Sequence, residues 1–204
     1  GRLAVDIGCG HGYSSHFMAE AGATVIGIDM SFSIEAAYAQ LRNENVYFVQ
    51  ADLQFPPLMH RQFDIVYSSG VIHHTNSTEL SFSIIQELVK PGGKLSVWLY
   101  HPIPSRIHNT ILFARRITRH VSVRLQFWIY FFTLLPIYLL IARIKGKKMT
   151  WREIMIDLID ILTPYYRYEH EPQETECWYV KHGFKNVKIT DSNFFGFSVY
   201  GIKE

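Results

Sequence analysis

The stretch Val5-Asp6-Ile7-Gly8-Cys9-Gly10-His11-Gly12 places an acidic residue and three alternating glycines between an apolar run and a helical pattern. Residues 3–7 predict a short buried strand, and residues 13–21 predict the helix that follows it. Glycines in such a turn allow unusual backbone conformations and a close approach of the backbone to a ligand. The stretch therefore indicates a strand-turn-helix nucleotide site.

Further apolar segments follow at the spacing of alternating strands and helices. Residues 25–29 predict a second strand, and its last residue, Asp29, stands 21 positions after Gly8, where a carboxylate can accept hydrogen bonds from ribose hydroxyls. Residues 46–49 predict a third strand, and residues 63–74 a fourth that runs into a polar turn. Residues 88–95 close a helix and open a fifth strand, which runs to residue 100.

These five motifs, in this order over residues 3–100, resemble the class I S-adenosylmethionine-dependent methyltransferases, especially their small-molecule branch. The resemblance implies S-adenosylmethionine as the cofactor. It also implies an α/β fold: a Rossmann-like, seven-stranded, mostly parallel sheet with helices on both faces and an antiparallel last strand. Residues 184–190 and 194–202 would supply the last two strands, and their short connection requires an antiparallel pair.

The resemblance assigns cofactor contacts to residues at the ends of the first four strands. In this assignment Asp29 holds the ribose, Met30 packs on the adenine, and Asp52 accepts from the adenine amino group. Asp52 could instead cap a helix. The whole predicted set is Asp6, Gly8, Gly10, Gly12, Asp29, Met30, Asp52, Leu53, Ser68 and Ser69.

A NAD-dependent oxidoreductase is the distant alternative, because it uses the same fold and a similar ribose carboxylate. Its pyrophosphate turn requires G-x-G-x-x-G, whereas residues 8–12 read G-x-G-x-G with Asp6 just before them. An acidic group at this position would repel a diphosphate but suits a ligand that carries an amino group and a sulfonium. The pattern therefore favours the methyltransferase.

Histidines and tyrosines are the candidates for catalysis and for the acceptor pocket. His73 and His74 follow the fourth strand, where a neutral imidazole could act as a general base at neutral pH. Such a pair could instead have no catalytic role and simply pack against the turn. His170 is a third candidate for the base or the pocket, and His101, Tyr165 and Tyr166 could line the pocket. The ten histidines and the acids show no tight metal-ligand spacing, so no metal is expected.

Composition agrees with one methyltransferase domain over residues 1–204. The 204 residues are 48% hydrophobic, which suffices for a sizeable core. Two cysteines provide no disulfide framework and indicate a reducing compartment, so we expect a cytoplasmic protein. Residues 102–163 predict a helical insertion after the fifth strand.

The insertion is basic and apolar. Residues 88–152 contain no Asp or Glu but hold 12 of the 20 lysines and arginines. At helical spacing an apolar stripe runs from Ile107 to Phe132, opposite a basic side, and residues 125–144 are long enough to be tested as a membrane span. Pro136 is expected to interrupt this segment, and basic clusters flank both of its ends, which argues against spanning. A substrate lid is favoured over an interfacial membrane helix formed by residues 106–148. The full predicted stripe is Ile107, Ile111, Ala114, Ile117, Val121, Leu125, Trp128 and Phe132.

The sequence thus predicts methyl transfer to a small, largely apolar molecule, with oxygen ahead of carbon or nitrogen as the methylated atom. The alternative is a membrane-surface methyltransferase acting on a lipid or quinone. No nucleic-acid partner is expected, because the Asn-Pro-Pro-aromatic signature of base and amide methyltransferases is absent after the fourth strand, where Ser68-Ser69-Gly70-Val71 stands.

Overall fold

The computed structural model describes the chain except for residues 42–43, 104, 119 and 194. Four side chains of the predicted stripe, Ile107, Ile111, Ala114 and Ile117, also lie outside the described part. The chain forms two compact units. The sheet unit comprises Gly1–Pro102 and Tyr168–Glu204, and the helical unit comprises Ile103–Arg167. Each is described by itself.

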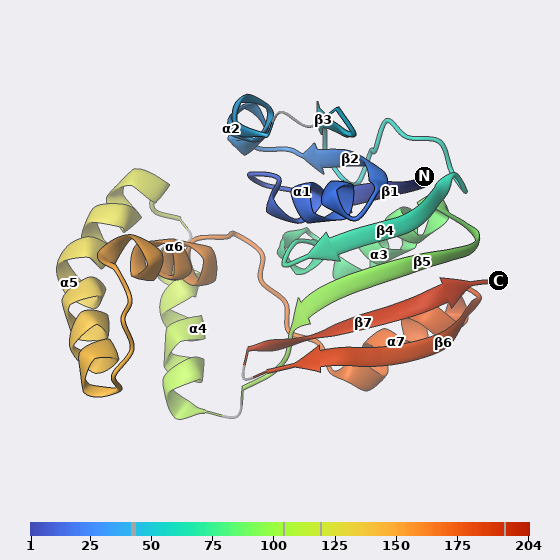
Figure 1. The fold of residues 1–204 in the computed structure, drawn as a ribbon. Coiled ribbons are helices and arrows are strands. Elements are labelled where there is room, and N and C mark those ends of the chain that lie inside the picture. Colours follow the sequence, from blue (N-terminus) through green and yellow to red (C-terminus); the bar gives the residue numbers. More distant parts are fainter. Residues whose placement is uncertain (42–43, 104, 119, 194) are drawn as a thin grey trace. The chain divides into compact units, whose positions relative to one another are not determined.

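A seven-stranded sheet forms the centre of the sheet unit, in the order β3-β2-β1-β4-β5-β7-β6 (Figure 1). All its neighbouring pairs are parallel except those that involve β7, as predicted for the reversed last strand. The strand order reverses between β1 and β4, and open α/β sheets bind ligands outside the carboxyl ends of strands at such a point. The strands are β1 (Arg2–Ile7), β2 (Ala23–Asp29), β3 (Val46–Gln50), β4 (Phe63–Ser69), β5 (Val89–Tyr100), β6 (Phe184–Ser192) and β7 (Gly196–Lys203).

Register brings the predicted cofactor residues to one edge of the sheet. Ile7 pairs with Ile28, and Asp29 pairs with Gln50, so β1, β2 and β3 end side by side. Asp6 pairs with Tyr67 on the other side of β1, which places the end of β4 next to the end of β1. The glycine turn, Asp29 and the segment after β4 therefore share the carboxyl edge.

Helices cover both faces of the sheet. Successive residues of a strand point to opposite faces, and here Ala4 and Val5 enter separate cores. Ala4 packs with Ala19 of α1, whereas Val5 belongs to the larger core with Phe82 of α3 and Tyr179 of α7. The helices of the unit are α1 (Tyr13–Glu20), α2 (Ser33–Gln40), α3 (Thr78–Ile85) and α7 (Pro172–Lys181), with short 3-10 turns at Ile72–His74 and Gln86–Leu88.

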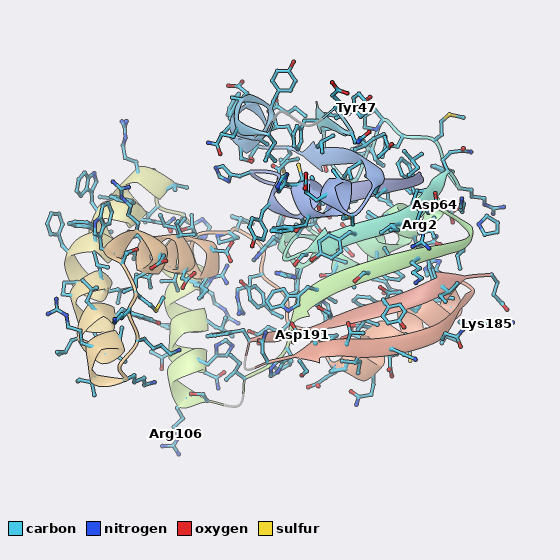
Figure 2. The ribbon with its side chains drawn as sticks, viewed as in Figure 1. Arg2, Tyr47, Asp64, Arg106, Lys185 and Asp191 are labelled. Carbon is cyan, nitrogen blue, oxygen red and sulfur yellow. The ribbon has the colours of Figure 1, made fainter. Side chains whose placement is uncertain are left out.

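The opposite, amino-terminal edge of the strands carries a charge cluster. Asp64 at the start of β4 accepts from the amide of Leu3 at 2.9 Å and pairs with Lys90. Arg2 and Asp64 lie close together at this edge (Figure 2). The hydrogen bond from Lys90, that from Leu3 and the nearby charges lower the pKa of Asp64. This cluster ties β1, β4 and β5 together, away from the carboxyl edge.

The helical unit contains α4 (Arg106–Thr118), α5 (Val123–Ile144) and α6 (Trp151–Leu162) (Figure 1). Its core joins Tyr130 and Leu135 of α5 to Ile154 and Leu158 of α6. A capping box starts α6: Thr150 accepts from the amide of Glu153, and the carboxylate of Glu153 accepts from the amide of Thr150 at 2.7 Å. These bonds lower the pKa of Glu153.

Two expectations for this region are wrong. The stripe from Ile107 to Phe132 does not follow one helix, because α4 ends at Thr118 and α5 begins at Val123. Ser122 caps α5, and the buried Gln126 donates to the carbonyls of Thr118 and Val121 at 2.9 and 2.7 Å, which fixes the break. Pro136 does not end a helix either.

The helix continues through Pro136 on its exposed side. Proline removes the hydrogen bond to the carbonyl of Phe132, and Phe132 is itself exposed, so the freed carbonyl belongs to a residue outside the core. In the sheet unit, a smaller difference concerns β5. This strand already begins at Val89, so the Pro-Gly-Gly turn lies within its bounds, next to an irregular pairing with Phe63 and Ile65.

Candidate functional site

The turn between β1 and α1 is built from glycines in the left-handed region. Gly8 has a φ of 75° and Gly10 a φ of 53°, which residues with a side chain rarely adopt. The amides of Gly8 and Cys9 donate to the carbonyl of Ile28 at 2.7 and 3.0 Å. These bonds fix the turn to the end of β2. Gly12, with a φ of 78°, precedes α1 as its N-cap.

Gly8 and Gly10 differ in what a side chain would meet. A Cβ on Gly8 would lie 2.3 Å from Cγ2 of Val71, so the missing side chain lets the segment after β4 pack against the turn. A Cβ on Gly10 would meet no other residue of the described chain within 4 Å. The backbone at Gly10 is therefore open to a ligand.

Asp29 lies beside this open backbone. Its Oδ2 accepts from the amide of Gly10 at 2.8 Å, and its Oδ1 accepts from the amide and hydroxyl of Ser31 at 2.8 and 2.6 Å. Each carboxylate oxygen has more than one acceptor position, so further donors can bind. The carboxylate is thus held in place at the edge where a ribose would lie.

Asp6 is buried at the end of β1, with 2% of its surface exposed. Its Oδ2 accepts from the hydroxyl of Ser15 in α1 at 2.7 Å. Burial raises the pKa of Asp6 to about 6; hydrogen bonding from Ser15 lowers it, and the charge of Asp29 raises it further. A cation at this turn would therefore stabilise the ionised form of Asp6.

Cys9 shows the sign of the local potential. Burial is the main reason why the pKa of its thiol rises to about 12, and the charges of Asp6 and Asp29 raise it further. A thiol with this pKa stays protonated and is a poor nucleophile. The turn thus has a negative potential, which favours a cationic ligand over a diphosphate.

The ends of β2 and β3 carry the predicted adenine contacts. Met30 is 72% exposed, and its carbonyl accepts from Gln50 Nε2 at 3.2 Å. Asp52 is exposed and accepts from the amide of Gln54 at 2.9 Å, which forms a local turn instead of a helix N-cap. Leu53 is buried in the larger core. Met30 and Asp52 are therefore accessible beside Asp29, whereas Leu53 is largely covered.

The two predicted serines at the end of β4 differ in their exposure. Ser68 is fully buried, and its hydroxyl donates to the carbonyl of Ile7 at 3.2 Å, which joins β4 to β1 at the strand-order reversal. Ser69 is exposed at the edge. The amide of Gly70 donates to the backbone carbonyl of Trp98 at 3.2 Å. Of the two serines, Ser69 is the one that a ligand could reach.

The histidine pair follows in a 3-10 turn. His73 is fully buried, and its ring centroid lies 4.3 Å from that of His74 and 4.4 Å from that of Tyr100. The carbonyl of His73 accepts from the amide of Tyr168 at 3.0 Å. His74 is half-buried. His73 is thus a packing residue of the turn, and His74 is the more accessible imidazole.

The other predicted pocket residues lie in two places. His170 is placed by polar contacts: Nε2 lies 2.9 Å from Thr78 Oγ1, and Nδ1 lies 3.1 Å from Glu174 Oε2. The ring nitrogens of His101 lie 3.0 Å from the carbonyl oxygens of Pro102 and Asn193. Both histidines therefore connect neighbouring segments of the sheet unit.

Tyr165 and Tyr166 belong to the helical unit. Their ring centroids are 4.9 Å apart, and both side chains are partly exposed. No three His, Cys, Asp or Glu side chains of the described residues gather closely enough to hold a metal ion.

Three residues that shape the turn were not predicted from the sequence. Ser15 bonds Asp6, Ser31 bonds Asp29, and Val71 packs against Gly8. Ser31 follows Asp29 by two residues, a spacing at which a carboxylate commonly accepts from the backbone, and this signal could have found it. Ser15 and Val71 depend on packing between distant segments, which leaves no local pattern.

Comparisons with known proteins agree with this geometry. The family described as "Methyltransferase domain" matches residues 5–97, which run from Val5 in β1 through the glycine turn to Val97 in β5. Residues 5–97 are a class I S-adenosylmethionine-dependent methyltransferase domain. The predicted family, fold and cofactor are confirmed for this domain.

One curated relative of the methyltransferase domain is the ubiquinone biosynthesis O-methyltransferase of Coxiella burnetii, 33% identical over 98 residues. The match covers 47% of this chain and 42% of the relative, so the chain spans less than half the length of the curated relatives it matches.

Two solved structures show the fold alone. The first is magnesium protoporphyrin IX methyltransferase from Synechocystis with bound S-adenosylhomocysteine: 19% identity, TM-score 0.60, covering 100% of this chain and 74% of that chain. The second is phosphoethanolamine N-methyltransferase 2 of Haemonchus contortus in complex with S-adenosylmethionine: 15% identity, TM-score 0.64, covering 100% and 49%.

The residues of the methyltransferase domain fit the cofactor. Gly10 leaves open space at the turn, Asp29 presents a fixed carboxylate beside it, and the charges of Asp6 and Asp29 act on the turn at Cys9. Asp29 would hold the ribose, Asp6 would face the cationic amino-acid part, and Met30 would cover the base.

Proposed function

We propose that this protein transfers the methyl group of S-adenosylmethionine to a small, largely apolar acceptor, with oxygen ahead of carbon or nitrogen as the methylated atom. One observation carries the proposal: the open backbone at Gly10, whose amide is held by the carboxylate of Asp29, in the turn that follows the buried Asp6. This arrangement suits a ligand with a ribose and a positive charge. The bound cofactor supplies a methyl group already activated by a sulfonium.

The residues of the domain would then position the reactants and exclude water. Ser68 and Val71 hold the segment after β4 against the glycine turn, and Ser69 borders the open edge. A base is needed only if the acceptor is a hydroxyl or an acidic carbon. His74 is then the preferred candidate, because His73 is fully buried against Tyr100.

A second candidate function is methylation of a lipid or quinone at a membrane surface, by a cytoplasmic protein that binds the membrane peripherally. An apolar cavity of about 200 Å³ inside the helical unit favours it. Tyr130 and Leu134 of α5 and Leu158 of α6 are among its lining residues. The similarity to a ubiquinone biosynthesis O-methyltransferase over 47% of the chain supports the same candidate.

Calorimetry with three ligands tests the proposal. We expect S-adenosylmethionine and S-adenosylhomocysteine to bind the full chain and NAD to bind weakly or not at all. Binding of NAD alone would overturn the methyltransferase assignment in favour of the oxidoreductase.

The two histidines are tested in the same way. Neither His73→Ala nor His74→Ala should change cofactor affinity. With a hydroxyl acceptor, His74→Ala should slow methyl transfer by roughly 100-fold or more, the usual contribution of a general base. An unchanged rate in His74→Ala would remove this histidine from catalysis.

A further inference from the structure

One side of α5 is apolar and exposed. We call this side the outer face and define it by the exposed large apolar residues that recur there at helical spacing: Leu125, Trp128, Ile129, Phe132, Leu140 and Ile144. Phe132, Leu140 and Ile144 have exposed fractions of 70, 60 and 77%. A contiguous apolar surface of this kind marks an interaction site.

The other side of α5 is packed. Tyr130, Leu135 and Ala142 are buried, and the first two share a core with Ile154 and Leu158 of α6. The hydroxyl of Tyr130 donates to Gln126 at 2.9 Å, so the polar groups on this side are also satisfied. The outer face is therefore what a folded three-helix unit leaves uncovered.

Positive charges flank the outer face at both ends. Arg124 precedes it, and Arg143, Lys145, Lys147 and Lys148 are exposed at its other end. Residues 88–152 contain no acid, so no carboxylate lies on α5 or beside its ends in the sequence. An apolar stripe between clusters of lysine and arginine matches the chemistry of an anionic bilayer, which offers acyl chains below phosphate headgroups.

We propose that the helical unit docks on an anionic lipid bilayer, with α5 parallel to the membrane plane. The outer face lies among the upper acyl chains, and Arg124, Arg143 and Lys145 to Lys148 meet the headgroups. This inference goes beyond the proposed function and does not depend on methyl transfer.

The packing of α6 against α5 favours an orientation of α5 parallel to the membrane plane. Among the described residues, α5 is the one helix long and apolar enough to cross a membrane, judged by length and composition alone. However, α6 packs along its inner side and carries Glu153, Asp157 and Asp160. A spanning α5 would take these acids into hydrocarbon, where charged side chains are costly. Docking in the interface leaves them in water.

A second copy of the chain is a poorer occupant of the outer face. Two outer faces packed together would bring the cations of one copy close to those of the other. Neither copy has a carboxylate between residues 88 and 152 to pair with them. Like charges at an interface oppose association, whereas anionic lipid neutralises them.

Cosedimentation with vesicles tests the proposal on the full chain. We expect binding to vesicles of phosphatidylglycerol mixed with phosphatidylcholine, weaker binding at high salt, and little binding to phosphatidylcholine alone. The double variant Phe132→Glu/Leu140→Glu should lower the partition coefficient by at least roughly 100-fold, because it replaces two anchors with anions. The matched control is Ile156→Glu, which alters an exposed apolar residue of α6 and should change binding by less than about twofold.

The charges are tested separately. Lys145→Gln, Lys147→Gln and Lys148→Gln should each weaken binding to anionic vesicles roughly fivefold, since one basic residue near such a surface contributes about that factor. Circular dichroism checks that every variant keeps its helix content. All substituted side chains are exposed, so the fold should persist.

Depth measurements test the orientation. In a Cys177→Ser background, with Cys9 buried, single cysteines at positions 125, 132 and 140 carry a polarity-sensitive fluorophore quenched by nitroxide lipids of known depth. A parallel helix places the three labels at one shallow depth. A spanning helix separates positions 125 and 140 by about 22 Å along the membrane normal, and this result would overturn the parallel orientation.

Two other results would overturn the docking itself. The first is no binding to anionic vesicles at low salt. The second is self-association of a chain that does not bind vesicles, if the double variant Phe132→Glu/Leu140→Glu abolishes it. This result would assign the outer face to a second copy of the chain. Either result leaves the proposed methyl transfer untouched, because cofactor calorimetry is measured without vesicles.

Discussion

The sheet unit and the helical unit use their apolar residues in different ways. In the sheet unit the strands are covered by helices, and Val5, Ile7, Val66 and Leu95 are fully buried. Its polar groups gather at the carboxyl edge of the strands. In the helical unit α5 buries one side and exposes the other.

The family match ends at Val97, before the helical unit begins at Ile103. The predicted cofactor residues therefore lie in the part of the chain that the family match covers, whereas the helical unit lies outside that match.

The prediction with the largest expected effect tests whether the two units unfold independently. Leu158 is 3% exposed in the core of the helical unit, and Leu158→Ala should cost about 2–5 kcal/mol of that unit's stability. We expect hydrogen exchange to accelerate in α5 and α6 while the amides of β1 and β4 keep their protection. Equal acceleration in both units would show one cooperative structure and break the comparison.

Asp6→Asn tests the buried carboxylate of the sheet unit. The pKa of Asp6 in the folded protein is about 6, above its ordinary value of 3.8, so folding favours the protonated form. Ionised Asp6 thus lowers stability above about pH 6, and this cost disappears as the pH falls below about 4. This difference between the two pKa values corresponds to at most about 3 kcal/mol.

Asp6→Asn should therefore raise the free energy of unfolding at pH 8 by up to about 3 kcal/mol and change it little at pH 4. Urea denaturation at both pH values measures this difference. The same variant should weaken binding of S-adenosylmethionine, because it removes a negative charge from the turn. The raised pKa would be contradicted if the stability of the variant minus that of the wild type were lower at pH 8 than at pH 4.

Asp29→Ala tests the ribose contact with a smaller expected effect. Loss of this carboxylate should weaken binding of S-adenosylhomocysteine by roughly 1–3 kcal/mol, the usual cost of unsatisfied hydrogen-bonding partners. Asp64→Ala is the matched control, since it removes a carboxylate at the opposite edge of the sheet (Figure 2). Equal losses of affinity in the two variants, measured by calorimetry, would mean that Asp29 acts through stability alone.

Local patterns were enough to predict most of the sheet unit. Alternation of apolar runs with glycine and acidic turns predicted the strands that carry Asp6 and Asp29 and the strand that precedes Asp52, because buried parallel strands are short, continuous and apolar. Pro172 stands at the first position of α7, and Gly183 lies just beyond its end, where the local preferences of proline and glycine favour them.

Features that depend on distant contacts were not predictable. Nothing local indicates that Ser15 bonds Asp6 or that Ser68 bonds the carbonyl of Ile7. The break between α4 and α5 was missed because the apolar period continues across it, while Gln126 fixes the turn through two backbone carbonyls. Pro136 was expected to interrupt its segment, but it lies on the exposed side of α5, where the helix tolerates a proline.

The most direct test of the cofactor site compares two glycines. Gly10 and Gly22 both have positive φ, and a Cβ on either meets no other described residue within 4 Å, so Ala should strain both backbones alike by about 1–2 kcal/mol. Only Gly10 lies at the turn held by Asp29. Titration with S-adenosylhomocysteine should show at least a roughly tenfold loss of affinity in Gly10→Ala and wild-type affinity in Gly22→Ala. Equal affinities in the two variants would contradict a cofactor site at this turn.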